Sequence, residues 1–227
     1  MSSVLVVAAH PDDEVLGCGA TIAGLSRTTK VDVAILGEGI TSRHEQRQHA
    51  DPAALTSLHE KAKAVAALLG AKSVTLEKLS DNRFDEVALL DIVKIVEGLI
   101  ARFNPAVIYT HHPGDLNIDH ALTFRAVLTA TRPTPGYPVK EIYAFEVNSS
   151  TEWAFQQIQP TFQPNVFVDV TSTIETKIRA MGLYESEARP FPHPRSPAAL
   201  RAQARRWGSV AGLEYAEAFQ LIRSVRS

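Results

Sequence analysis

Five consecutive residues near the start of the chain carry side chains that bind metal ions and transfer protons. The run His10-Pro11-Asp12-Asp13-Glu14 places one imidazole and three carboxylates in a single segment. It follows an apolar stretch, residues 4–9, that we expect to form a buried strand, and it precedes a glycine-rich turn and a predicted helix. Ligands of open α/β sheets bind beyond the carboxyl ends of the strands. We therefore expect this segment to form part of a ligand site.

A second segment with metal-binding side chains spans residues 110–120 and includes His111, His112, Asp119 and His120. It also follows an apolar stretch and precedes a predicted helix. Because the loops after parallel strands emerge at one edge of the sheet, the two segments can meet in the fold. Two imidazoles and one carboxylate around a metal leave positions open for water, as in catalytic zinc sites. The same ligands equally suit non-haem Fe(II).

The neighbouring carboxylates Asp12 and Asp13 suggest a division of roles. Side chains of adjacent residues in an extended or turning segment point in different directions. One carboxylate can then bind the metal, while the other accepts a proton from a water whose pKa the metal lowers toward about 7. Asp119, directly before His120, is a candidate for orienting a nearby imidazole from outside the ligand set.

Two motifs of the chain resemble those of a known enzyme family. The stretch Ala9-His10-Pro11-Asp12-Asp13-Glu14 resembles the signature of the PIG-L/LmbE-like deacetylases, and Asn117-x-Asp119-His120 resembles their second motif. Residues 37–39, 81–84 and 215–219 are also similar, so the resemblance covers nearly the whole chain. This family is metal-dependent and removes acetyl groups from N-acetylglucosamine-type amino sugars. The resemblance implies the same hydrolysis here, on a small amino-sugar substrate that is free or conjugated.

The resemblance also implies roles for single residues. His10, Asp13 and His120 match the family's metal ligands, and Asp12 matches its general base. Asp119 matches a residue that modulates a histidine near the metal. The expected ion is Zn²⁺, with Fe²⁺ or Mn²⁺ as alternatives. Because relatives often assemble as trimers or hexamers, a homo-oligomer is implied as well.

One position departs from the family pattern. Many members carry a histidine three positions before the last metal ligand, where it stabilises the oxyanion, and this chain has Asn117 there. An asparagine amide can donate a hydrogen bond to an oxyanion, which is typically worth about 3 kcal/mol. It cannot give a proton to the leaving amine. That task would fall to Asp12, or to another imidazole such as His111 or His112.

Further residues are candidate substrate contacts. Asp81 lies where the family often has a sugar-binding carboxylate, and the resemblance suggests Arg43 and Arg83 as its neighbours. His112 stands beside Pro113 and close to the expected metal ligands, so it is expected to face the same pocket.

Structural interpretations compete with several of these assignments. The acidic run 12–14 could have no function beyond capping a helix, since carboxylates favour helix N-termini. With His10 ahead of it and a second cluster present, we favour the metal site, but for Glu14 a structural role. Gly17-Cys18-Gly19 resembles part of a dinucleotide fingerprint, although the third glycine is absent. We expect these glycines to allow close backbone packing and Cys18 to be a small core residue.

Two other functions remain open at this point. The chain could be a metal-dependent hydrolase of another bond, such as a phosphoester, although two-metal phosphatases need more carboxylate ligands than these segments offer. It could also be a catalytically weak protein that binds carbohydrate or metal on the same fold, which Asn117 would favour.

The composition is that of a globular protein. Of 227 residues, 45% are hydrophobic and 21% charged, and the net charge of -2 gives no basic surface for nucleic acid. No apolar run approaches the roughly 20 residues that span a bilayer. The single cysteine excludes an intrachain disulfide, and the N-terminus lacks the basic region of a signal peptide. We therefore expect a cytoplasmic protein.

Apolar stretches alternate with helical patterns along the chain, which predicts one α/β domain over residues 1–227. The expected architecture is a Rossmann-like, three-layer αβα arrangement with a mostly parallel sheet. Strands are predicted at 4–9, 31–36, 74–79, 106–110, 141–147 and 165–170. Helices are predicted at 58–69, 87–103, 119–131 and 173–187, and residues 197–225 are predicted to form two helices broken near 208–212.

Overall fold

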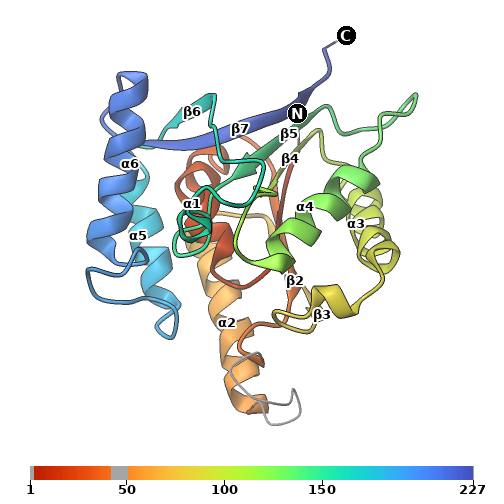
Figure 1. Cartoon of the computed structure of the whole chain (residues 1–227), viewed down its shortest axis with the longest axis horizontal. Coiled ribbons are helices and arrows are strands. Elements are labelled where there is room, and N and C mark those ends of the chain that lie inside the picture. Colours follow the sequence, from red (N-terminus) through yellow and green to blue (C-terminus); the bar gives the residue numbers. More distant parts are fainter. Residues whose placement is uncertain (1–2, 42–50, 227) are drawn as a thin grey trace.

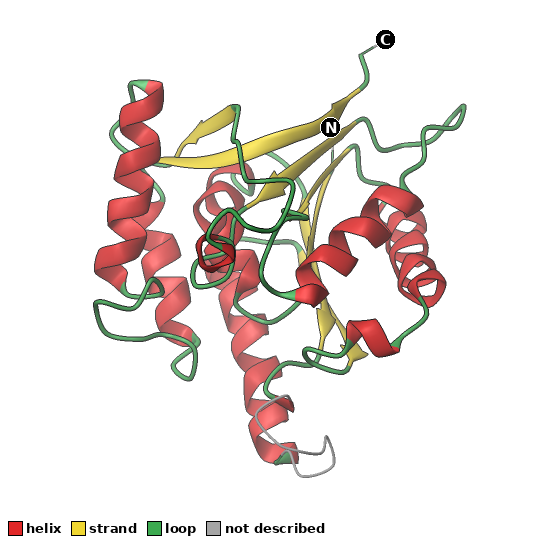
Figure 2. Ribbon diagram, in the orientation of Figure 1, coloured by secondary structure: helices red, strands yellow, loops and turns green. Residues whose placement is uncertain are grey.

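A twisted sheet runs through the centre of the molecule, with helices on both sides of it (Figures 1 and 2). The computed structural model describes residues 3–41 and 51–226. Within these residues seven strands form one sheet, in the order β3-β2-β1-β4-β5-β7-β6. Their bounds are β1 Val4–Ala8, β2 Val31–Gly37, β3 Ser73–Leu79, β4 Val107–His111, β5 Glu141–Phe145, β6 Val166–Asp169 and β7 Ala216–Ser224.

The first five strands pair in parallel, and the chain crosses from one side of β1 to the other between β3 and β4. The strand β7 is antiparallel to both of its neighbours, β5 and β6. This topology confirms the predicted α/β, Rossmann-like architecture. It also creates a switch point between the neighbouring strands β1 and β4. Ligands of such sheets bind at this point.

Helices cover both faces of the sheet. Those of the described residues are α1 Asp13–Leu25, α2 Pro52–Leu68, α3 Leu89–Phe103, α4 Ile118–Ala130, α5 Ile174–Leu183 and α6 Pro197–Ala211, with short 3₁₀ turns η3 Phe84–Glu86 and η4 Glu152–Ala154. None of them is long and apolar enough to cross a membrane.

Alternation along β1 divides the core into two layers. Val4, Val6 and Ala8 pack in a cluster that α1, α2 and α5 cover, whereas Leu5 and Val7 pack in a cluster that α3 and α4 cover. Side chains of a strand alternate between faces, so a strand between two helical layers must be apolar throughout. The continuous apolar stretch at residues 4–9 was therefore correctly predicted to be a buried strand, β1.

The C-terminal region is where the predicted elements are wrong. Residues 197–225 form one helix, α6, and then the strand β7. Gly212, at φ 74°, ends the helix in the left-handed conformation that glycine adopts easily. Alanines at 216 and 218 favour a helix in isolation, but pairing with β5 and β6 overrides this preference.

A buried ion pair explains the buried glutamate within β7. Glu217 is 4% exposed and accepts hydrogen bonds from the N–H groups of Ala20 and Thr21, at 3.2 and 2.7 Å. These groups follow a kink in α1 at Cys18, whose φ is −148°. Lys177 Nζ donates to Glu217 Oε1 at 2.6 Å and to the carbonyl of Leu16 at 2.7 Å. The final strand thereby supports the helix that begins at the first motif.

Candidate metal centre and active site

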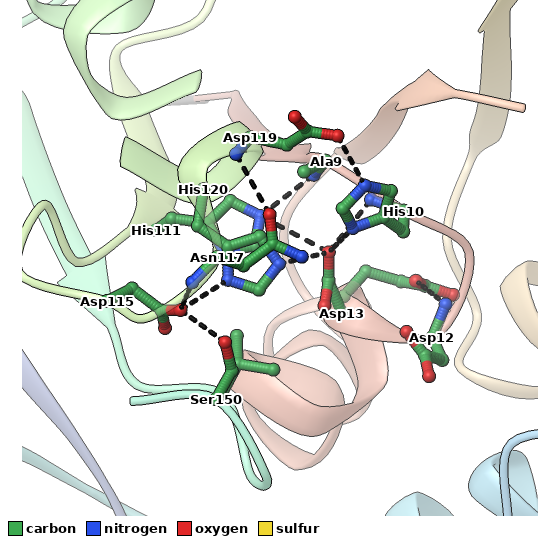
Figure 3. A network of polar contacts seen from close by, with 12 residues as sticks. Ala9, His10, Asp12, Asp13, His111, Asp115, Asn117, Asp119, His120 and Ser150 are labelled. Atoms are coloured by element: carbon green, nitrogen blue, oxygen red, sulfur yellow. Dashed lines mark hydrogen bonds and ion pairs between the residues drawn. The ribbon is translucent and has the colours of Figure 1, made fainter. Parts of the chain in front are cut away.

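The two predicted segments meet at the carboxyl ends of neighbouring strands. β1 and β4 pair in register, with Val4 opposite Val107, so the residues after both strands emerge side by side. His10 and Asp13 come from the turn after β1 and the start of α1, whereas His120 lies in the first turn of α4. Figure 3 shows these three side chains pointing toward one another. The structure thus brings together the residues that the sequence suggested as ligands.

One oxygen of Asp13 lies at the centre of the cluster. Asp13 Oδ2 is 3.2 Å from His10 Nδ1 and 3.2 Å from His120 Nε2. All three residues are buried, and one ligand atom from each lies within 4.8 Å of the others. Two imidazole nitrogens and a carboxylate oxygen are a donor set that suits zinc and leaves coordination positions open. The residues present therefore fit a divalent metal ion.

Asp119 fixes the orientation of His10. Its Oδ2 lies 2.9 Å from His10 Nε2, and its Oδ1 accepts the N–H of Phe84 at 3.0 Å. Asp81 Oδ1 is 3.2 Å from the same Nε2. Metal-binding histidines usually donate their other ring N–H to a carboxylate, which sets the tautomer. The Nδ1 of His10 is then the nitrogen that faces Asp13.

Asp115 holds His120 in the same way, and its role was missed in the sequence. Its Oδ1 is 3.1 Å from His120 Nδ1. Ser150 and Thr151 hydroxyls and the N–H of Asn117 all donate to this carboxylate. The only signal in the sequence was a further carboxylate within the second segment, because Ser150 and Thr151 come from a distant loop. Each candidate histidine ligand is thus backed by its own carboxylate.

In the metal-free protein, the pKa values of His10 and His120 are raised, so these imidazoles hold their protons more strongly. Burial lowers the pKa of His10, but hydrogen bonds to Asp119 and Asp13 outweigh it and raise that pKa well above the usual range. Burial also opposes protonation of His120, yet the charge of Asp13 and the hydrogen bond to Asp115 raise its pKa to about 9. A metal ion must displace such protons, so its binding is expected to release them.

The two other histidines of the second segment do not face the cluster's open side. His111 is fully buried, accepts the N–H of Ala9 at Nε2 over 2.8 Å, and stacks on His120 with 4.0 Å between ring centroids. His112 Nε2 lies 2.7 Å from the carbonyl oxygen of Pro160, and His112 does not line the cavity beside the cluster. The structure does not bring His112 to the metal ligands, and a substrate contact by His112 stays a prediction.

Asp12 occupies an unusual backbone conformation beside the cluster. Its φ is 119°, which residues other than glycine rarely adopt. Its N–H donates to Glu14 Oε2 at 3.0 Å, and its Oδ2 lies 2.6 Å from Arg195 Nη1. Glu14 points into the protein, where the Tyr184 hydroxyl donates to it at 2.7 Å. Burial raises the pKa of Glu14 to about 7.

Asn117 combines a structural role with a position at the cavity. Its Oδ1 caps α4 by accepting the N–H of Asp119 at 2.9 Å, and its Nδ2 donates to Asn82 Oδ1 at 2.8 Å. The amide is therefore held in one orientation. One hydrogen on Nδ2 remains beyond the one given to Asn82.

A cavity of about 250 Å³ opens over the cluster. The candidate ligands form its floor, and its other polar walls include Asp12, Asp81, Asn82, Asn117, Ser150 and Arg195. Asp81 thus lines the cavity, and its contact with a substrate stays a prediction. Arg83 pairs instead with Glu86 at the exposed surface. Arg43 lies outside the described residues.

Comparison with known proteins identifies the family. The family model described as "PIG-L: GlcNAc-PI de-N-acetylase" matches residues 5–131, more than half of the 227-residue chain. The chain belongs to the PIG-L family. The matched region contains both motifs of the metal cluster, from β1 to the end of α4. Arg195, Glu187 and β7 lie beyond it.

Curated relatives of this PIG-L family chain include two deacetylases. It is 26% identical to the diacetylchitobiose deacetylase of Thermococcus kodakarensis, over 99% of the chain and 85% of the relative. It is also 26% identical to the uncharacterized deacetylase YaiS of Escherichia coli K12, over 81% of the chain and 90% of the relative.

Among solved structures, the 4-carboxy-2-hydroxymuconate hydratase GalB of Pseudomonas putida KT2440 has the same fold, with a TM-score of 0.76. The match covers 100% of the chain and 98% of GalB, at 23% identity. A likeness at this identity shows the fold alone. Because this neighbour is a hydratase, the reaction of the present chain must be argued from its own site.

Proposed function

We propose that the chain is a metal-dependent N-deacetylase that hydrolyses the acetamide of an N-acetylglucosamine-type amino sugar, free or conjugated. The observation that carries this proposal is the pair of buried imidazoles, each backed by a carboxylate, that converge on Asp13 beside Asp12. Membership of the PIG-L family supports the reaction. The relative named as a diacetylchitobiose deacetylase supports an amino-sugar substrate.

The metal would be held by His10, Asp13 and His120, and we propose zinc, with Fe²⁺ or Mn²⁺ as the alternatives. The bound ion supplies a Lewis acid that polarises the acetamide carbonyl and lowers the pKa of a water toward neutrality. The carboxylates behind the two histidines hold the imidazoles neutral and correctly oriented once the ion is in place.

Asp12 is the proposed general base. It lines the same cavity as the candidate ligands, and its carboxylate can accept the proton of the attacking water. The remaining hydrogen on Asn117 Nδ2 can donate to the oxyanion that forms from the acetamide carbonyl. Because neither His111 nor His112 lines the cavity, Asp12 is also the proposed donor of a proton to the leaving amine.

The polar cavity favours a small, hydroxyl-rich substrate. Its walls offer carboxylates at Asp81 and amides at Asn82 and Asn117, which can bind sugar hydroxyl groups. A sugar hydroxyl that pairs with Asp81 would place the acetamide over the metal ligands. We therefore propose that Asp81 binds the substrate, and the variant Asp81→Ala should have a raised KM.

An acetate-release assay tests the proposal. Purified protein, stripped and reloaded with Zn²⁺, Fe²⁺ or Mn²⁺, is incubated with N-acetylglucosamine, diacetylchitobiose and N-acetylglucosamine conjugates. We expect acetate and a free amine in equal amounts with at least one metal, and no release by Asp12→Asn. Phosphate release from sugar phosphates, measured in parallel, would favour phosphoester hydrolysis instead. Sugar binding without turnover under every condition would contradict the proposed activity and favour a binding protein.

A further inference from the structure

An arginine outside both motifs reaches the proposed general base. Arg195 lies in the loop between α5 and α6, 183 positions after Asp12, and its Nη1 donates to Asp12 Oδ2 at 2.6 Å. Only 20% of the Arg195 side chain is exposed. Among the described residues that line the cavity, it is the only lysine or arginine.

Several contacts hold the guanidinium in one place. Its Nε donates to Ser149 Oγ at 2.7 Å, and its Nη1 also reaches Glu187 Oε2 at 3.2 Å. The Arg195 N–H donates to His193 Nδ1 at 3.1 Å. The next residue, Ser196, is the N-cap of α6 and accepts the N–H of Ala199 at 3.2 Å. The arginine therefore extends from a fixed backbone and does not depend on substrate for its position.

The charge around Arg195 argues against a role as an anion receptor. Its single positive charge is shared by two carboxylates, those of Asp12 and Glu187. An anionic substrate group would have to displace one of them, and a buried carboxylate without its partner is costly. The contacts instead suit a group that orients a carboxylate, because the guanidinium is itself held by Ser149 and its Nη1 makes a charge-assisted hydrogen bond to one oxygen of Asp12.

We propose that Arg195 is a positioning residue for Asp12: it holds Oδ2, so that Oδ1 is the oxygen that accepts the proton of the attacking water. This inference rests on the proposed deacetylase function. The backbone of Asp12 is held separately, because its N–H donates to Glu14 and its carbonyl accepts the N–H groups of Val15 and Leu16. Arg195 thus acts on the side chain of Asp12, whose torsions the backbone leaves free.

The turn that contains Ser149 and Ser150 contacts both Arg195 and the carboxylate behind a candidate metal ligand. Ser149 accepts the hydrogen bond from Arg195, and the adjacent Ser150 donates to Asp115, which holds His120. The turn therefore places the base and a candidate ligand relative to one another. Loss of Arg195 should misplace the base while the metal ligands keep their own partners.

The experiment compares Arg195→Ala and Arg195→Lys with the wild type in the acetate-release assay, with metal content measured on each protein. For Arg195→Ala we expect full metal content, kcat lower by on the order of 10²-fold and KM changed by less than about threefold, since misplacement of a catalytic group acts on the reacting state. Lysine, or guanidinium added to Arg195→Ala, should restore part of kcat. A purely structural role would not give this rescue.

Arg201→Ala is the matched control, because Arg201 lies on α6 and pairs with the exposed Glu175 away from the cavity. It should match the wild type. If the wild type releases acetate and Arg195→Ala has an unchanged kcat, or only a raised KM, the positioning role is wrong. If the wild type releases no acetate with any metal, the deacetylase function is wrong, and the positioning role is wrong with it.

Discussion

His10 and Asp119 meet through Nε2 and Oδ2 at 2.9 Å, although 109 positions separate them in the sequence. The contact joins the turn after β1 to the first turn of α4, and it leaves His10 Nδ1 to face Asp13. Asp119 Oδ1 is in turn held by the N–H of Phe84 in η3. Three separate segments therefore set the direction of one imidazole nitrogen.

Substitution Asp119→Asn should weaken metal binding without abolishing it. The amide can still accept the Phe84 N–H, but it loses the negative charge that favours the proton on His10 Nε2. Loss of such a carboxylate typically costs 10- to 100-fold in metal affinity. Competition with a chromogenic chelator measures this. An affinity equal to that of the wild type would show that Asp119 does not tune the metal ligand.

Substitutions at the two motifs should separate metal binding from turnover. His10→Ala and His120→Ala each remove a candidate ligand and should lose the metal, whereas Asp12→Ala should keep near-stoichiometric metal and lose most of kcat. Plasma mass spectrometry on the purified variants measures metal content. His112→Ala is the control, because its ring lies against Pro160 and Phe162, and it should keep its metal. Full metal content in both His10→Ala and His120→Ala would exclude the ligand assignment.

Glu14 should make the metal-free protein less stable as the pH rises. Burial raises the pKa of this carboxyl from 4.5 to about 7 in the folded state. Between these values the folded protein holds a proton that the unfolded chain has lost. Stability is therefore fully present below about pH 4.5 and falls as the pH rises to about 7, by about 3 kcal/mol in all.

Glu14→Gln carries no such proton, and its amide oxygen can still accept from the Tyr184 hydroxyl. Urea unfolding of the metal-free proteins across this pH range measures the effect. The stability of the variant should change less steeply with pH than that of the wild type. Parallel curves would mean that Glu14 is not the group responsible.

The buried pair Lys177–Glu217 should matter for stability rather than for chemistry. Lys177→Met leaves the Glu217 carboxylate buried beside two backbone N–H groups but without its cation, and breaking such a pair costs about 3–5 kcal/mol. The double substitution Lys177→Met/Glu217→Gln removes both charges and should recover part of this loss. Urea denaturation measures all three proteins. A double variant less stable than Lys177→Met would contradict this account.

The sequence predicted the parts of the site that depend on local pattern and on sheet topology. His10, Asp13 and His120 could be brought together because each follows an apolar strand, and neighbouring parallel strands deliver their loops to one edge. The buried first strand, β1, was equally clear, since both of its faces are apolar. Most other predicted elements agree with the structure to within a few residues at their ends.

What the sequence did not reveal are partners that arrive from distant loops. Asp115 is recognised as the support of His120 only when Ser150 and Thr151 are seen to donate to it. Arg195 lies in a proline-rich loop with no motif of its own, and its contact with Asp12 depends on how α5 and α6 pack. β7 was predicted to be a helix, because the charged Glu217 interrupts the apolar pattern expected of a buried strand. Its partner, Lys177, is not evident from the sequence.

The place of β7 in the sheet has a consequence for biosynthesis. This strand is the last element along the described residues, yet it pairs on both sides, with β5 and with β6. Until residues 216–224 leave the ribosome, β5 keeps an unpaired edge, which is prone to pair with other chains. The kinked helix α1 also lacks the Glu217 carboxylate. A metal centre encoded mainly by residues 10–120 therefore completes its scaffold only after residues 216–224 have been synthesised.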